Sequence, residues 1–219
     1  MQNCLELTKY GLALHTSSLE LGLAISNFAG EERSATWELG RSLSTYLHYH
    51  LAQFIQPQTW ADLAFIAVAK GPGSFTSTRM GVVTARTLAQ QLNIPLFGVS
   101  TLAALAWSHH LDEASLTEPI LVKAVELPAQ QSQLFTAIYQ VNSTNSGLIQ
   151  LLPDAVLTIA AWQQKLAHWS TPYQLIHAPT NLGASVSSLL ELAYLEWQKG
   201  QFPHWSEVLP FYGQHPVDS

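Results

Sequence analysis

The run from Leu63 to Ala69 constrains the fold of this chain most strongly, because it contains no polar residue after Asp62. A strand without polar alternation is buried on both faces, and such strands are typical of sheets that helices cover on two sides. The run enters a Gly-Pro-Gly turn at Gly71–Gly73, and Ser74-Phe75-Thr76 then opens a helix. This strand, turn and helix predict an α/β fold.

The remaining segments repeat one order, in which strands come first and helix, strand and helix follow. In the first part we predict strands and helices in the order Gly11–His15, Leu19–Ser26, Glu31–Thr36, helix Trp37–Ile55, Leu63–Ala69, helix Ser74–Leu92, Leu96–Val99 and a helix capped by Ser100 that runs to His110. In the second part we predict Ile120–Glu126, Leu134–Val141, Leu148–Leu152, helix Ile159–Trp169, Tyr173–His177, helix Ala184–Lys199 and an extended strap, Phe202–Ser219. The fold class is therefore α/β with two similar lobes of mixed sheet flanked by helices, one formed by residues 1–111 and the other by residues 112–219.

The composition indicates which class of molecule the chain binds and in which cellular compartment we expect it. Only 11% of the 219 residues are charged and 47% are hydrophobic, so part of the surface is uncharged and suits a protein partner. The formal charge of −6 and the scattered bases argue against a nucleic-acid grip by this chain alone. We expect a soluble cytoplasmic protein, because the first residues lack a signal-peptide core and no apolar run is long enough for a membrane span.

The Gly-Pro-Gly loop does not match the known phosphate-binding or nucleophile patterns. A P-loop starting at Gly71 would need glycine at position 76 and lysine at 77, whereas Thr76 and Ser77 stand there and Lys70 precedes the loop. A dinucleotide fingerprint would need a third glycine, and a nucleophile elbow would need glycines two residues either side of Ser74. The structural interpretation is a turn whose Ser74 or Thr76 caps the helix, and an anion site at the helix N-terminus is the alternative.

The histidines raise the question of a metal site, and the arginines raise the question of a contact face. No pair among the nine histidines has metal-ligand spacing, so we expect no metal site, and His168, His177, His204 and His215 each stand alone. Arg79 and Arg86 lie seven residues apart and share a helix face. That face is either a solvated basic edge or a contact face for an acidic partner.

The loop and its helix resemble the signature of the TsaB (YeaZ) family, bacterial proteins needed for the threonylcarbamoyl modification of adenosine 37 in tRNA. The segments that carry the resemblance are Gly71-Pro72-Gly73-Ser74-Phe75-Thr76, Arg79, Gly81-Val82, Thr84-Ala85, Leu88-Ala89, Gly11–Leu14 with Thr16-Ser17, Ile94-Pro95, Gly98–Leu102 and Leu209–Tyr212. Residues 112–200 match only in outline. The resemblance implies the two-lobed fold of actin, Hsp70 and sugar kinases.

Three places depart from what the resemblance implies. His15 stands where nucleotide-binding relatives of this fold carry an aspartate for phosphates and metal, and Mg²⁺ prefers hard oxygen ligands. Glu126-Leu127-Pro128 stands where the family tends to carry Asp-Ala-Arg. Ser100–Ala104 has no histidine where the catalytic relative, TsaD, carries a metal-binding pair.

The resemblance therefore implies a non-catalytic subunit with no cofactor, which pairs with TsaD, is joined by TsaE and reaches tRNA only through that complex. A homodimer of the isolated chain is also open, and so are two enzymatic alternatives, a small phosphotransferase or ATPase and a peptidase. We expect the partner interface on the first long helix and on the loop helix, although ordinary core packing is the alternative for each apolar member. The expected interface residues are Leu43, Tyr46, Leu47, His50, Phe75, Arg79, Val82 and Arg86.

Overall fold

A computed structural model describes residues 5–112, 121–142 and 146–213 of the chain. The predicted polar segment 111–119 lies mostly outside these ranges, as do most of the predicted turn at 143–147 and the last six residues of the predicted strap. The first half contains β1 (Tyr10–His15), β2 (Glu20–Ser26), β3 (Glu32–Glu38), η1 (Gly40–Ser42), α1 (Leu43–Phe54), η2 (Trp60–Asp62), β4 (Leu63–Ala69), α2 (Phe75–Leu92), β5 (Leu96–Val99) and α3 (Thr101–Asp112). The second half contains β6 (Val122–Pro128), β7 (Gln133–Val141), β8 (Leu148–Thr158), α4 (Ile159–Ala167), β9 (Gln174–His177), η3 (Gly183–Ser185), α5 (Val186–Gln198) and η4 (Trp205–Glu207).

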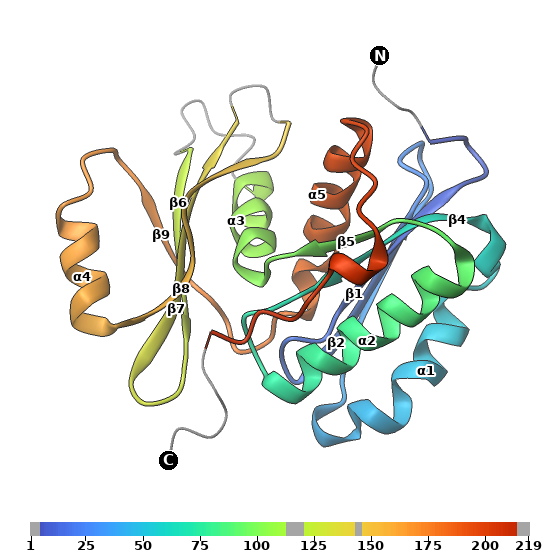
Figure 1. Cartoon of the computed structure of the whole chain (residues 1–219), viewed down its shortest axis with the longest axis horizontal. Helices are drawn as coiled ribbons and strands as arrows, with labels where there is room; N and C mark the ends of the chain where they lie inside the picture. Colours follow the sequence, from blue (N-terminus) through green and yellow to red (C-terminus); the bar gives the residue numbers. More distant parts are fainter. Residues whose placement is uncertain (1–4, 113–120, 143–145, 214–219) are drawn as a thin grey trace.

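Two mixed sheets stand side by side with helices on both faces of each (Figure 1). The first has the order β3-β2-β1-β4-β5, in which β1 and β2 are antiparallel and β4 is parallel to both β1 and β5. The second has the order β8-β7-β6-β9, with β6 and β9 parallel and the other pairs antiparallel. This arrangement confirms the predicted α/β class with two mixed sheets.

The helices form three layers around the sheets (Figure 1). Helices α1 and α2 cover the outer face of the first sheet, and α4 covers the outer face of the second. Helices α3 and α5 lie between the two sheets and contact each other. Because α5 comes from the second half of the sequence yet packs on β1, β2 and β4, it ties the halves together. The boundary between residues 111 and 112 stays a prediction.

Two predicted boundaries are wrong. The first long helix begins at Leu43 rather than at Trp37, because Trp37 pairs with Leu21 in the β2–β3 ladder. In addition, Gly40 has a positive φ of 51°, which a right-handed helix does not contain. Strand β8 runs on past Leu152 to Thr158, through Pro153. Proline is compatible with this strand because β8 is at the edge of its sheet.

Burial on α1 corrects part of the expected partner interface. The side chains of Leu43 and Leu47 are fully buried in the core between α1 and the first sheet, and Val82 on α2 is buried in the same core. These three residues therefore cannot reach a partner in the folded chain. The apolar periodicity of α1 is helical as predicted, but the apolar stripe packs on the chain's own first sheet.

Replacing Leu47 with glutamate should unfold the protein rather than only break an assembly. A carboxylate in a fully buried, apolar site is destabilising by about 4 kcal/mol or more. Tyr46→Glu is the matched control, because the Tyr46 side chain is 47% exposed on the same helix; its effect should stay within about 0.5 kcal/mol. Urea unfolding of both variants measures the difference, and equal stability of the two would contradict the burial of Leu47.

Candidate functional site

The Gly-Pro-Gly loop adopts a backbone that only glycine allows at two positions. Gly71 has φ +98°, and a Cβ there would lie 2.6 Å from the Phe211 carbonyl oxygen. Gly73 has φ +154°, and a Cβ there would collide with the Ser17 carbonyl oxygen. The glycines are therefore required for close approach to two other parts of the chain.

The first of these parts is the β1–β2 turn. The backbone N–H of Ser74 donates to the Ser17 carbonyl at 2.8 Å, and the Thr16 hydroxyl donates to the Ser77 carbonyl at 2.8 Å. Ser74 occupies the N-cap position of α2, but its side chain makes no cap hydrogen bond. Its hydroxyl instead donates to Ser77 Oγ at 3.0 Å, so the predicted side-chain cap is wrong at Ser74.

The second part is the C-terminal strap. The backbone N–H of Phe211 donates to the Lys70 carbonyl at 2.6 Å, and the Tyr212 ring lies 4.4 Å from the Phe75 ring between centroids. The start of α3 joins the same junction, since the Thr101 N–H donates to the Gly71 carbonyl at 2.9 Å. Segments that are far apart in the sequence therefore meet at one loop.

A cavity of about 500 Å³, which we call the loop cavity, lies between this junction and the second sheet. Its described lining comes from the β1–β2 turn, the loop, the β6–β7 connection and the strap: Ser17, Ser18, Leu19, Gly73, Ser74, Phe75, Thr78, Leu127, Pro128, Ala129, Gln130, Phe135, Thr180, Leu182, Phe211 and Tyr212. No charged side chain is in this lining. A phosphate would find hydroxyls and backbone there, but no lysine or arginine to neutralise it.

His15 ends β1 at the centre of the first sheet and is completely buried. Its Nδ1 accepts the Ser17 N–H at 3.4 Å, and its Nε2 has no hydrogen-bond partner among the described residues. Burial lowers the pKa of His15 to about 4, so the imidazole is neutral near pH 7. A neutral ring at this position offers no negative charge to a metal or to an ammonium group.

Glu126, in the second of the three departures, is held by two neighbours in the second lobe. Its Oε2 accepts the Trp162 indole N–H at 2.7 Å, and its Oε1 lies 2.6 Å from His177 Nδ1. The sequence left His177 without a partner, but β6 and β9 pair in parallel and bring Glu126 and His177 side by side. Glu126 therefore anchors α4 and the end of β9.

Ser100 confirms its predicted cap and has a second role that sequence reasoning missed. Its Oγ accepts the N–H groups of Leu102 and Ala103 at 3.1 and 3.3 Å. The same oxygen lies 3.3 Å from the Tyr139 hydroxyl, which donates to Asp154 Oδ1 at 2.6 Å. Burial raises the pKa of both Tyr139 and Asp154. No local pattern links these residues, because Ser100 precedes α3 whereas Tyr139 and Asp154 lie on β7 and β8, and only the fold brings them together.

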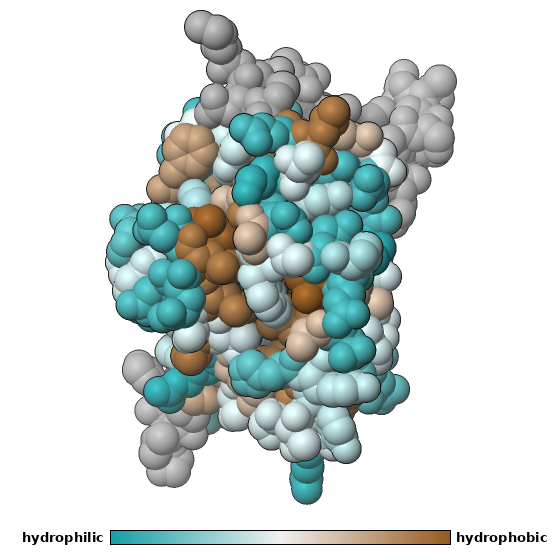
Figure 2. Space-filling view, turned by 90° about the vertical axis from the view of Figure 1, so that its right-hand side faces the viewer, coloured by the Kyte–Doolittle hydropathy of each residue, from teal (hydrophilic) through white to brown (hydrophobic). Residues whose placement is uncertain are grey.

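A third region, the α1–α2 groove, is a cavity of about 630 Å³ on the outer face of the first lobe. Its described lining is His48, Leu51, Trp60, Thr76, Arg79, Met80, Val83, Thr84, Thr87 and Leu88. Figure 2 looks onto the side of the molecule that carries these helices and shows hydrophobic side chains gathered beside a hollow. Val83, in this groove, is 54% exposed.

Arg79 is the one member of the expected interface set that lines the groove. Tyr46 is exposed on α1, whereas His50, Phe75 and Arg86 are half-buried. His50 stacks on Trp37 at 4.6 Å between ring centroids, and Arg86 lies 5.8 Å from the Trp205 ring. The structure thus brings the accessible members onto neighbouring helices without bringing them into one cluster.

None of the described helices is both long and apolar enough to cross a membrane. Among the described residues, no three or more His, Cys, Asp or Glu side chains are grouped so that they could hold a metal ion. The expectation that the chain uses no metal and no cofactor stays a prediction.

Comparison with known proteins gives agreeing results at the level of family and fold. The family model described as "TsaD: tRNA N6-adenosine threonylcarbamoyltransferase" matches residues 56–209, more than half of the chain. The tRNA threonylcarbamoyladenosine biosynthesis protein TsaB of Bacillus subtilis (strain 168) is 38% identical over 122 residues, which is 55% of this chain and 49% of that protein. TsaB of Buchnera aphidicola subsp. Acyrthosiphon pisum is 26% identical over 153 residues, or 68% of this chain and 63% of that protein.

The solved structure of YeaZ from Pseudomonas aeruginosa has the same fold, with a TM-score of 0.73 at 21% identity over 93% of this chain and 99% of that one. This likeness confirms the predicted fold, in which helices flank two mixed sheets. The chain belongs to the family that the model describes, and the resemblance to the TsaB (YeaZ) family agrees with the names of these relatives. It spans about half the length of the B. subtilis relative and less than two thirds of the Buchnera one.

The buried His15 predicts a measurable pH dependence of stability. Below pH 6.5 the unfolded chain binds a proton at this residue, whereas the folded chain does not until about pH 4. Stability is therefore complete above pH 6.5 and falls as the pH drops towards 4, by about 3 kcal/mol in total. His15→Gln removes the titration and should flatten the curve between pH 6.5 and 4. Identical slopes for the variant and the natural chain would show that His15 is not buried as a neutral ring.

Proposed function

We propose that this chain is a non-catalytic subunit for the N6-threonylcarbamoyladenosine modification of adenosine 37 in tRNA, and that it supports the catalytic subunit TsaD. The names of its relatives support the pathway. The loop cavity supports the non-catalytic role, because its described lining has no charged side chain and the neighbouring strand ends in a neutral, buried histidine. In this role the loop is a scaffold that joins the β1–β2 turn, α2, α3 and the strap.

The α1–α2 groove is the surface that we assign to TsaD, and it is the observation that carries the proposal. The groove is largely apolar, and the exposed Val83, Tyr46 and Tyr49 lie on its two helices. A stable interface covers about 800 Å² on each partner, so contact would extend from the groove to the exposed tyrosines of α1. The proposed partner face therefore keeps Tyr46 and Arg79 of the expected set and adds Val83, whereas the buried Leu43, Leu47 and Val82 do not belong to it.

The charges on this surface indicate the chemistry of the partner. Helices α1 and α2 contain two arginines, two histidines and no aspartate or glutamate, although the whole chain has a formal charge of −6. A partner with an apolar ridge and an acidic rim is complementary to this face. We assign the role of this partner to TsaD, and TsaE then joins the assembled pair.

A homodimer of the isolated chain would use the same face. We place the assembly in the cytoplasm, where tRNA is modified.

The substitution Val83→Glu should abolish binding to TsaD while the chain stays folded. The new carboxylate would lie in the groove and would have to be desolvated against an apolar and acidic partner surface. We expect at least a hundredfold loss in affinity by isothermal titration calorimetry with purified TsaD from the same organism. Lys165→Glu is the control, because Lys165 is exposed on α4 at the opposite end of the molecule (Figure 1). Unchanged affinity of the Val83→Glu variant would remove the groove from the interface.

Binding of tRNA should require the complex. Non-specific affinity comes mainly from neutralised phosphates, and Arg79 and Arg86 would supply about two contacts, for a salt slope near −2. We expect labelled tRNA to bind the chain alone only weakly at 150 mM salt and to bind the TsaD complex much more tightly. Submicromolar binding by the chain alone, with a steep salt slope, would make it a direct RNA-binding subunit.

A further inference from the structure

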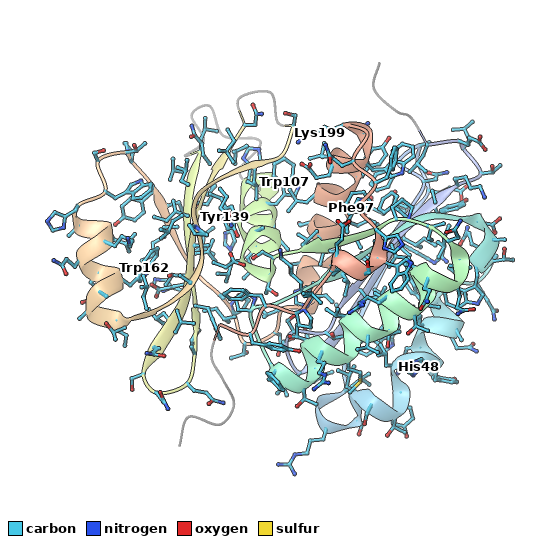
Figure 3. All side chains as sticks on the ribbon, in the orientation of Figure 1. His48, Phe97, Trp107, Tyr139, Trp162 and Lys199 are labelled. Atoms are coloured by element: carbon cyan, nitrogen blue, oxygen red, sulfur yellow. The ribbon has the colours of Figure 1, made fainter. Side chains whose placement is uncertain are left out.

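A cavity of about 840 Å³ is lined in part by the strap, and we call it the strap cavity. Its walls come from β5, from α5, which packs on the first sheet, from β7 and β8 of the second sheet, and from Gln201 and strap residues 202–209. Figure 3 labels Phe97 on β5 and Tyr139 on β7, which lie on the facing sides of the two lobes. This cavity shares no lining residue with the α1–α2 groove, so it is separate from the surface assigned to TsaD.

One basic residue, Lys70, is in the described lining of the strap cavity. It follows β4 directly and so stands at the carboxyl end of a central parallel strand, where open α/β sheets usually bind ligands. Within the described residues its ammonium group has no hydrogen-bond partner and no ion-pair partner, although its stem passes close to Gly98. A half-buried lysine that lines a cavity without a partner is a ready contact for an anionic group.

Asp154 of the second lobe is close enough for the positive charge of Lys70 to lower its pKa, although burial raises that pKa overall. Asp154 lies behind Tyr139 and accepts its hydroxyl at 2.6 Å, and no ion pair within 4.0 Å joins Asp154 to Lys70. The Tyr139 phenol is buried and also lies 3.3 Å from Ser100 Oγ, so its hydrogen bonds are made within the protein. Lys70 is therefore the group in the described lining that can contact an anion.

The rest of the lining is suited to an apolar body that carries a single anionic group. Phe97 and Leu192 form buried walls, while Phe202 and Leu209 on the strap are 53% and 62% exposed. A ligand that covers these two strap residues would remove apolar surface from water. Glu196, which pairs with Lys199 at 2.7 Å, and Glu207 stand at the same cavity and would repel a second anionic group.

We propose that the strap cavity binds a small organic molecule that has one carboxylate or phosphate group on an apolar, ring-sized body. The anionic group contacts the Lys70 ammonium, and the body lies between Phe97, Leu192 and the strap. Ligand binding would hold the two lobes and the strap together, since all three contribute to the walls.

The test uses 2-naphthoate and 2-naphthyl phosphate as probes, with 2-naphthol as the uncharged control, and measures binding to the full chain by calorimetry. We expect saturable binding of at least one anion, and the preferred one identifies the carboxylate or the phosphate. Lys70→Met should weaken that binding about tenfold or more, since a charge-assisted hydrogen bond is lost. Lys165→Met on α4 should leave it unchanged.

Lys70→Arg keeps the charge and should retain most of the affinity, which separates loss of the ammonium from loss of the fold. The melting temperature of each variant without probe checks the fold independently. The proposal is overturned if neither anion binds saturably below about 1 mM, if Lys70→Met binds as tightly as the natural chain, or if 2-naphthol binds as tightly as the anions. None of these results depends on TsaD, so they are independent of the proposed function.

Discussion

The close contact between the Gly-Pro-Gly loop and the β1–β2 turn is the constraint on which the rest of the structure depends. Ser17 approaches Gly73 so closely that no side chain fits there, and the Ser74 N–H completes the contact. This contact fixes the start of α2, and α2 in turn presents one wall of the α1–α2 groove. The strap then closes over the same loop through Phe211, and Gly213 packs against Phe135 and Val156 of the second lobe. A loop that resembles a phosphate cradle thus joins two lobes.

Much of the fold could be predicted from the sequence, because its signals are local. The uninterrupted apolar strand β4, the cap at Ser100 and the glycine-rich loop each determine their own conformation from neighbouring residues. The start of α1 could not be predicted, since pairing of Trp37 with β2 outweighs its place in a helical pattern. Tertiary packing also decided which face of α1 is buried.

Some of the site residues could likewise be identified from local sequence, and others could not. The loop was identifiable because its spacing is specific, whereas the pair of Glu126 and His177 depends on the parallel register of β6 and β9. The contact of Ser100, Tyr139 and Asp154 depends on how the two sheets face each other. The resulting molecule keeps its surfaces apart, with an apolar, carboxylate-free helical face outside and a mixed-charge cavity between the lobes.

Hydrogen–deuterium exchange of the chain, alone and with saturating TsaD, tests the central claim most directly, because it reports where the partner binds without any substitution. The account predicts slower exchange in peptides from α1 and α2, with little change in α4 and β9. Protection confined to the loop cavity or to the second lobe, with α1 and α2 unchanged, would contradict it.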